Sequence, residues 1–342
     1  YGGEDCYAAG MIGVVGSGTW AILTDCVVKG SINATTDNGK KRMAGFVYGL
    51  GDNSSCTLTN CLYLGTSNVT DKGYTFADKA TLTNCYYLNA CGTAQGKQVT
   101  KEQLKNGDVA RLLQSNRNTQ FWGQELGKEN EPLPTAEEAK KVYNIDFAYK
   151  GKVKASRYAN PGKAIFGGMP TFIAKDIMDS EYNEHHYYTF AFGNNFNASV
   201  LIYYDRTVDI NPTEKDYYEI ASKDNWIEFS NIVSSGQNSV DAKMTKDVDL
   251  GSDIWQVGNH YAGTFDGQGH TLTINWNSGS EAWISPFYTV ENATIKNLRT
   301  QGEIKSSSHF LSGLVQSAYG NTTISGCVSA VNITSTYDNG GC

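Results

Sequence analysis

The feature that most constrains the fold is a degenerate repeat of two short motifs in residues 1–95. The first is a run of small residues, at positions 9–13 (AGMIG) and 44–49 (AGFVYG). The second is a strand-like run that ends in cysteine, at positions 23–26 (LTDC), 58–61 (LTNC) and 82–85 (LTNC). Cys61 follows Cys26 by 35 residues, and Cys85 follows Cys61 by 24. Periods of this length predict stacked β units whose apolar faces are buried against their neighbours, with the cysteines forming an internal ladder.

Both motifs return near the other end of the chain. Residues 312–315 (SGLV) match the small-residue run, and residues 323–327 (TISGC) match the cysteine run. Residues 294–298 (TIKNL) are a further copy, with Leu298 in the place of cysteine. We therefore expect a second set of coils in this part of the chain.

The two ends of the chain are in matching phase within this repeat. Residues 338–342 form a Gly-rich turn where a small-residue run is due next, and residues 1–3 form the turn that precedes such a run. One interpretation is that the 342-residue unit recurs, either in tandem in one chain or by subunits stacked coil upon coil. The alternative is an arbitrary boundary inside a longer solenoid.

Residues 248–298 carry the clearest strand pattern. Leu272, Ile274 and Trp276 alternate with polar residues, which predicts a strand with these three side chains inward. Asp266 and His270 flank a Gly-Gln-Gly sequence, and we expect them to form hydrogen bonds at a tight corner.

Four segments are predicted from these patterns. We expect β-solenoid coils in 1–95, a helical and loop cap in 96–139, a small separate β domain in 140–220, and a capping helix followed by coils in 221–342. A capping-box sequence from Thr100 to Gln103 begins the first helical segment, which we expect to close the end of the coils. In the last segment Trp226, Phe229 and Val233 share one helix face, with Asp224 as the expected N-cap.

Composition is typical of a turn-rich extracellular β protein. Charged residues make up only 18%, with 36 Gly and 21 Tyr. The net charge of −7 has no basic stripe, which argues against nucleic acid as a partner, and no apolar run predicts membrane insertion. The eight cysteines include no CxxC pair, so we expect buried thiols, although Cys6, Cys56, Cys91 and Cys342 lie off the ladder and could form disulfides.

The chain resembles bacterial extracellular proteins with GLUG-type repeats, which are adhesin-like surface proteins. The resemblance implies a right-handed parallel β-helix on a cell surface, with no catalytic residues to transfer. The residues that carry it lie at 103–127, 225–229, 246–250, 263–271, 292–298 and 313–315, together with the cysteine runs.

An enzyme remains the less favoured interpretation. A polysaccharide lyase would need clustered carboxylates beside a base. Asp247, Asp249 and Asp253 are the densest carboxylates, but we expect them to mark a turn between inward-facing residues. His185 and His186 are adjacent, so we expect them to point to opposite faces of a strand and not to chelate one ion. The sequence therefore predicts no catalytic residues and no residues that bind a cofactor or a metal ion. It also predicts that the protein uses no cofactor.

Two functions remain open at this stage. The favoured one is a non-enzymatic structural protein, a module of an extracellular fibre, filament or cell-surface adhesin that associates end to end with copies of itself as a homopolymer. Surface glycans or host proteins are further candidate partners. The alternative is a carbohydrate-binding or polysaccharide-lyase-like β-helix, since three pairs of adjacent tyrosines (86–87, 203–204 and 217–218) could stack on sugars, although we expect burial of one ring in each.

Overall fold

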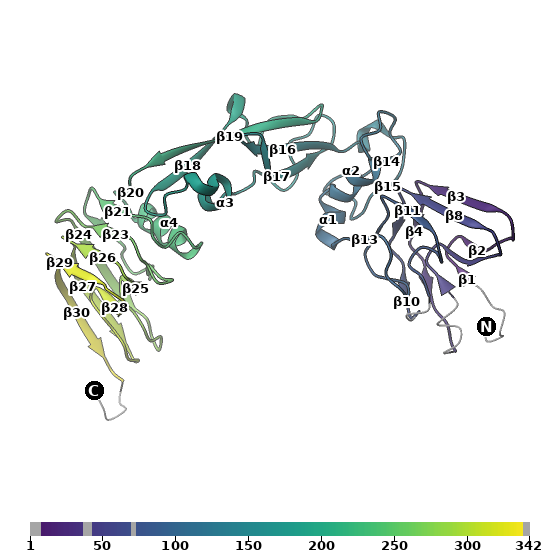
Figure 1. The fold of residues 1–342 in the computed structure, drawn as a ribbon. Helices are drawn as coiled ribbons and strands as arrows, with labels where there is room; N and C mark the ends of the chain where they lie inside the picture. The colour runs from purple at the N-terminus through teal and green to yellow at the C-terminus, as the bar shows by residue number, and fades with distance from the viewer. Residues whose placement is uncertain (1–7, 37–42, 70–72, 338–342) are drawn as a thin grey trace. The chain divides into compact units, whose positions relative to one another are not determined.

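The computed structural model describes residues 8–36, 43–69 and 73–337. Strands dominate, with a few short helices (Figure 1). The chain divides into two compact units. Unit 1 contains Tyr1–Thr171 and Phe192–Ile210, and unit 2 contains Phe172–Ala191 and Asn211–Cys342. The predicted junction of residues 338–342 with residues 1–3 lies outside the described residues.

Unit 1 begins with three sequence repeats, each made of short strands. The first repeat contains β1 (Ala8–Ala9), β2 (Ile12–Val15), β3 (Trp20–Thr24), β4 (Val27–Val28) and β5 (Ser31–Ile32). The second contains β6 (Met43–Ala44), β7 (Val47–Leu50), β8 (Ser55–Thr59), β9 (Leu62–Tyr63) and β10 (Thr66–Ser67). The third contains β11 (Thr81–Thr83) and β12 (Tyr86–Tyr87), followed by β13 (Lys97–Gln98).

All strand pairs between these repeats are parallel, and each joins equivalent positions of the two motifs. Ile22 on β3 pairs with Thr57 on β8, which pairs with Thr81 on β11. The small-residue motif behaves in the same way, because Ile12 pairs with Val47. The register predicted from the 35- and 24-residue spacings is therefore confirmed.

A one-residue corner explains why the cysteine motif has the form Thr-Asp/Asn-Cys. Asp25, Asn60 and Asn84 each have φ of +54°. Asp and Asn enter this left-handed region more readily than other non-Gly residues. The corner turns the chain so that the following cysteine faces inward. Cys61 and Cys85 are buried and Cys26 is partly buried, as the predicted ladder requires.

The helices α1 (Lys101–Lys105) and α2 (Asp108–Gln114) follow the third repeat. Thr100 forms the predicted capping box with Gln103. Leu104, Val109 and Leu113 pack with Leu62 of β9 and Tyr86 of β12. These two strand residues adjoin the interior residues Tyr63 and Tyr87 and face the other way, so the helices contact the side of the repeats. This differs from the expectation that they close an end.

The rest of unit 1 includes a β-hairpin. β14 (Trp122–Gly123) and β15 (Leu133–Pro134) pair in a small antiparallel sheet. β16 (Tyr143–Tyr149) and β17 (Lys152–Ala159) form the antiparallel hairpin, and β16 also pairs in parallel with the first residues of β19 (Arg206–Lys215). Residues 201–204 contribute one bridge residue, Ile202, which pairs with Lys163. Pro212 lies within β19.

Unit 2 contains a second set of parallel repeats. It begins with β18 (Tyr187–Phe192, the last residue belonging to unit 1), α3 (Ala174–Met178) and β20 (Tyr218–Ile220). Then come α4 (Lys223–Ser234), β21 (Ala242–Met244), β22 (Val248–Asp249), β23 (Thr264–Asp266) and β24 (Thr271–Asn277). The penultimate repeat contains β25 (Phe287–Glu291), β26 (Thr294–Lys296) and β27 (Arg299–Ser306), and the last repeat contains β28 (Val315–Tyr319), β29 (Thr323–Ser325) and β30 (Val328–Ser335).

The predicted details of unit 2 are largely confirmed. Leu272, Ile274 and Trp276 are buried on β24. Thr294 pairs with Thr323, which places Leu298 in the position of Cys327 as expected. The helix α4 buries the three predicted apolar residues, but its N-cap is Ser222 and not Asp224, because the Ser222 side chain accepts a hydrogen bond from the Asn225 backbone N–H.

Candidate functional site

The last repeat of unit 2 exposes side chains that are buried one repeat earlier. Ile324 is 47% exposed, whereas its register partner Ile295 is fully buried. Ile333 is also 47% exposed, whereas its partner Ile304 is fully buried. The interior of the repeats is therefore uncovered at this end within the described residues. We call this surface the open face of unit 2, formed by Ile324, Cys327, Val331 and Ile333.

The strand edges at this face are also free. β28, β29 and β30 are each the outermost strand of their sheets among the described residues. The N–H groups of Val328 and Thr336 donate to β27 or its flanking residues, at Leu298 and Ser306. Since backbone groups alternate in direction along a strand, the N–H groups of the odd-numbered residues between them point to the free edge. The open face thus combines apolar side chains with unused backbone donors.

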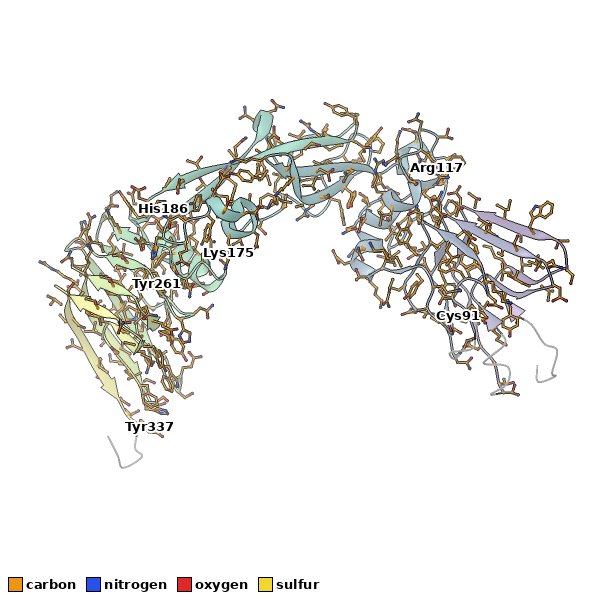
Figure 2. The ribbon with its side chains drawn as sticks, viewed as in Figure 1. Cys91, Arg117, Lys175, His186, Tyr261 and Tyr337 are labelled. Atoms are coloured by element: carbon orange, nitrogen blue, oxygen red, sulfur yellow. The ribbon has the colours of Figure 1, made fainter. Side chains whose placement is uncertain are left out.

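The opposite end of the unit 2 repeats is covered. The ring of Trp226 on α4 packs 5.8 Å from Phe265 and 5.7 Å from Phe287. The Trp226 indole N–H donates to the Trp255 carbonyl at 2.8 Å. Beside them Tyr261 is fully buried inside unit 2 (Figure 2), and burial holds its pKa well above the ordinary value, so its hydroxyl stays protonated. The helix α4 therefore packs against the apolar interior of the unit 2 repeats.

The first repeat of unit 1 is less covered than the second at some interior positions, although Leu23 and Val28 in it are only 6% and 7% exposed. Ala21 and Ile12 are only partly buried, whereas their register partners Cys56 and Val47 are 1% and 0% exposed. β3 and β4 are the outermost strands of their sheets within the described part of the chain. We call this surface the open face of unit 1, formed by Ile12, Ala21, Cys26 and Ile32. Trp20 and Ile22 beside it are 74% and 70% exposed.

The third repeat of unit 1 is closed by residues 91–98. Gln95 Oε1 accepts hydrogen bonds from the backbone N–H groups of Phe76 and Ala77 at 2.9 and 3.0 Å. Gln95 Nε2 donates to the Ala77 carbonyl at 2.7 Å. This side chain therefore satisfies backbone groups as another strand would, and the edge behind it is blocked.

A row of polar side chains follows the corners of unit 1. Asn84 Nδ2 donates to Asn60 Oδ1 at 2.8 Å and to the Leu112 carbonyl of α2 at 2.7 Å. Asp25 accepts two hydrogen bonds from the Arg117 guanidinium, at 2.7 and 2.8 Å, and one from the Trp122 indole at 2.7 Å (Figure 2 labels Arg117). These contacts attach the helical segment to the repeats.

The carboxylates singled out in the sequence act locally. Asp247 accepts a hydrogen bond from the Thr271 N–H at 2.9 Å, and its pKa is lowered by this bond and by His270. Asp249 accepts from the Gly251 N–H at 2.8 Å, and Asp253 pairs with Lys223 at 2.6 Å. Val248 and Leu250 are buried between them, as expected. Among the described residues, no three His, Cys, Asp or Glu side chains are arranged to hold a metal ion.

The corner pair Asp266 and His270 also has local partners. Asp266 Oδ1 accepts from the Gln268 N–H at 3.0 Å, as expected at a tight corner. Burial of Asp266 opposes ionisation, but this bond, Asn297 and Lys296 together lower its pKa. His270 Nδ1 lies 3.2 Å from Asp247 Oδ1.

The adjacent histidines do not converge on one site. Both lie in the turn before β18 and not on a strand as expected. His185 Nδ1 lies 3.3 Å from Asp241 Oδ1, and His186 Nδ1 lies 2.6 Å from Glu214 Oε1 (Figure 2 labels His186). Each histidine thus has its own carboxylate.

The structure also gives the surroundings of the off-ladder cysteines and of the tyrosine pairs that the sequence singled out. Cys56 and Cys91 are free thiols, and burial raises the pKa of both, while Cys6 and Cys342 lie outside the described residues.

Tyr86 and Tyr87 are both buried, and Tyr218 is buried beside a partly exposed Tyr217. The expected burial of one ring is wrong for Tyr203 and Tyr204, which are 61% and 62% exposed.

Comparison of this chain with protein-family models, curated proteins and solved structures gives no match. Within the part of the chain that the structure describes, no helix is long and apolar enough to cross a membrane.

Proposed function

We propose that the chain is a non-enzymatic structural and adhesive module of a bacterial extracellular fibre or surface protein, and that its parallel repeats are coils of a right-handed β-helix. The low charge and the abundance of Gly and Tyr support an extracellular location. The observation that carries the proposal is the reduced burial of interior positions in the last repeat of unit 2, where Ile324 and Ile333 are exposed although their register partners are buried. In the first repeat of unit 1, Ile12 and Ala21 are partly buried although their partners are buried.

In this proposal the partner of each open face is a second copy of the same chain. The repeats of unit 1 are uncovered at their first member and those of unit 2 at their last. The open face of unit 2 from one copy and the open face of unit 1 from another can therefore meet with all strands still parallel. Such a head-to-tail contact uses two different surfaces and forms a filament if the rotation does not close a ring. Strand addition supplies the backbone hydrogen bonds of this contact.

The opposing alternative, a polysaccharide lyase, has less support. Asp249 accepts from Gly251 in its own turn, Asp253 pairs with Lys223 of α4, and Asp247 accepts from Thr271 at the start of β24. The three carboxylates therefore have separate partners and do not form one cluster. The proposal predicts no turnover of acidic or neutral polysaccharides.

The test is self-association of chains with one open face blocked. Ile333→Lys places a charge at a β30 position whose side chain faces the interior of the repeats, and Ala21→Lys does the same on β3. Asn332→Lys and Ile22→Lys are the matched controls, because they add the same charge one residue away, on the outer faces of the same strands. Sedimentation velocity should show filaments or oligomers for the native chain and both controls, and monomers for each blocked variant.

A mixture of the two blocked variants distinguishes head-to-tail contacts from symmetric ones. Each blocked variant retains one intact open face of a different kind, so an equimolar mixture should form dimers and nothing longer. Electron microscopy of the native chain should show fibres with one chain per axial repeat. Monomers at all concentrations for the native chain, or equal association of Ile333→Lys and its control, would refute the proposal. Thermal unfolding of each variant verifies that it is folded.

A further inference from the structure

Unit 1 contains a polar cavity of about 750 Å³ that the proposed self-association does not use. It lies between α2 and one face of the sheet formed by β16, β17 and the start of β19. Register places alternate residues of these strands on that face, since Asn144 pairs with Tyr158 and Asp146 pairs with Ser156 and Thr207. The residues on the sheet side that line the cavity are Asn144, Asp146, Ser156, Tyr158, Asp205, Arg206 and Thr207.

Several of its polar groups are held in fixed positions. Asp108 of α2 accepts hydrogen bonds from the Tyr158 hydroxyl and from Gln103 Nε2, both at 2.9 Å. Burial, reinforced by the Asp108 charge, raises the pKa of Tyr158 well above its ordinary value, so the hydroxyl remains a donor. Asp205 accepts from the Asn144 N–H at 2.8 Å and pairs with Arg111. The walls are therefore preorganised before any ligand enters.

Two acceptors in the cavity are not used by the described residues. Asn144 Oδ1 is buried and accepts no hydrogen bond. Asp146 Oδ1 accepts from Ser156 Oγ at 2.6 Å, but no described group donates to its Oδ2. Buried acceptors are normally paired, so the unused Asn144 Oδ1 favours a ligand that donates, and the half-buried Asp146 carboxylate on the same sheet face offers a second acceptor.

The charges restrict that ligand further. Three carboxylates, Asp108, Asp146 and Asp205, line the cavity with two cations, Arg111 and Arg206, so the lining has a small negative excess that disfavours an anion. These carboxylates belong to no group suited to a metal ion among the described residues. Arg111 beside Asp205 disfavours an organic cation. A hydroxyl group both donates and accepts, and it suits a wall of carboxylates, amides and hydroxyls.

We propose that this cavity binds a neutral saccharide, with sugar hydroxyls donating to Asp146 Oδ2 and Asn144 Oδ1. The cavity volume is within the range of small-molecule sites in proteins, about 300–1,000 Å³. Tyr204 lies beside it with its exposed ring 6.0 Å from the Arg206 guanidinium, and Arg206 belongs to the lining. This ring could contact a sugar that extends out of the cavity.

Saturation-transfer NMR on the full chain tests the proposal, with glucose, galactose, mannose and N-acetylglucosamine as probes. At least one sugar should receive saturation from the native chain. Asp146→Asn keeps the shape of the side chain but replaces a charged acceptor, and it should weaken binding by about tenfold. Asp209→Asn is the matched control, because Asp209 is an exposed carboxylate on the same face of β19 that does not line the cavity, and it should bind as the native chain does.

Three results would overturn the proposal. These are no transfer to any of the four sugars, equal binding by Asp146→Asn and native chain, or binding of ethylammonium in preference to the sugars. Asn144→Leu provides a second variant, in case Asp146→Asn is poorly folded, and it should also weaken binding. Neither variant alters an open face, so the filament assays should be unchanged. Failure of this proposal is therefore distinguishable from failure of the proposed function.

Discussion

Ile304 on β27 and Ile333 on β30 are register partners, yet Ile304 is fully buried and Ile333 is 47% exposed. The two side chains point in the same direction from neighbouring strands. Ile304 on β27 has a strand on each side, β24 and β30, whereas Ile333 on β30 has only β27 beside it among the described residues. The difference in exposure between Ile304 and Ile333 therefore indicates how much of the Ile333 side chain one additional repeat would bury.

Truncation of the same residue type should have different effects at the two positions. Ile304→Ala should lower the free energy of unfolding by about 2–5 kcal/mol, because it leaves a cavity among packed neighbours. Ile333→Ala should cost about 1 kcal/mol or less in the unassembled chain, because half of the side chain is already in water. Urea unfolding followed by hydrogen exchange of unit 2 peptides checks this. Equal effects would mean that Ile333 is covered.

Replacement of a corner residue should separate its conformational role from its hydrogen bonds. Asn84→Gly keeps the φ of +54° accessible but removes the bonds to Asn60 and Leu112. We expect a loss of about 1–3 kcal/mol in unfolding free energy from this change. Asn84→Ala should lose roughly 1 kcal/mol more, because alanine is strained in the left-handed region. If alanine and glycine are equivalent, the corner does not depend on φ.

The Asp247 carboxylate should make stability depend on pH in acid. Its folded-state pKa lies below the ordinary 3.8, first because of the Thr271 N–H and then because of His270. A carboxylate with a depressed pKa stabilises the fold above its unfolded pKa, and this contribution disappears as the pH falls through the folded pKa. Asp247→Asn should therefore have a lower Tm than the native chain at pH 7. That difference should shrink below about pH 4, and a constant difference in Tm would contradict the prediction.

Alkylation of the cysteines should report on the open face of unit 2. Cys327 is partly buried there, whereas Cys61 and Cys91 are fully buried. Iodoacetamide should modify Cys327 in the dilute native chain much faster than Cys61 and Cys91, and all three should react in urea. At concentrations that produce filaments, modification of Cys327 should slow, as mass spectrometry of the peptides can show. Unchanged reactivity on assembly would place the contact elsewhere.

The repeat register could be predicted from sequence because it depends on local chemistry. A residue that tolerates positive φ followed by an inward cysteine recurs at Asn60 and Asn84, and this pattern fixes which strands align. The alternation along β24 was equally informative, since Leu272 and Ile274 are buried as expected.

Other features could not be predicted because they depend on contacts distant in sequence. The side of the repeats against which α2 packs is set by the reach of Leu112 and Arg117 to the corners. Pro212 is tolerated within β19, against its usual role of ending strands. The polar cavity combines residues from segments as far apart as Asp108 and Asp205, and no local pattern marks it.

The unequal spacing of the unit 1 repeats has a consequence for how this chain can vary. Ile22 and Thr57 are 35 residues apart and Thr57 and Thr81 are 24 apart, yet both intervals give parallel pairing in the same register. The connecting loops therefore absorb an insertion or deletion of about ten residues, while the corners and inward side chains stay in place. Loop length can therefore vary between chains of this kind while the scaffold of aligned strands beneath the loops is preserved.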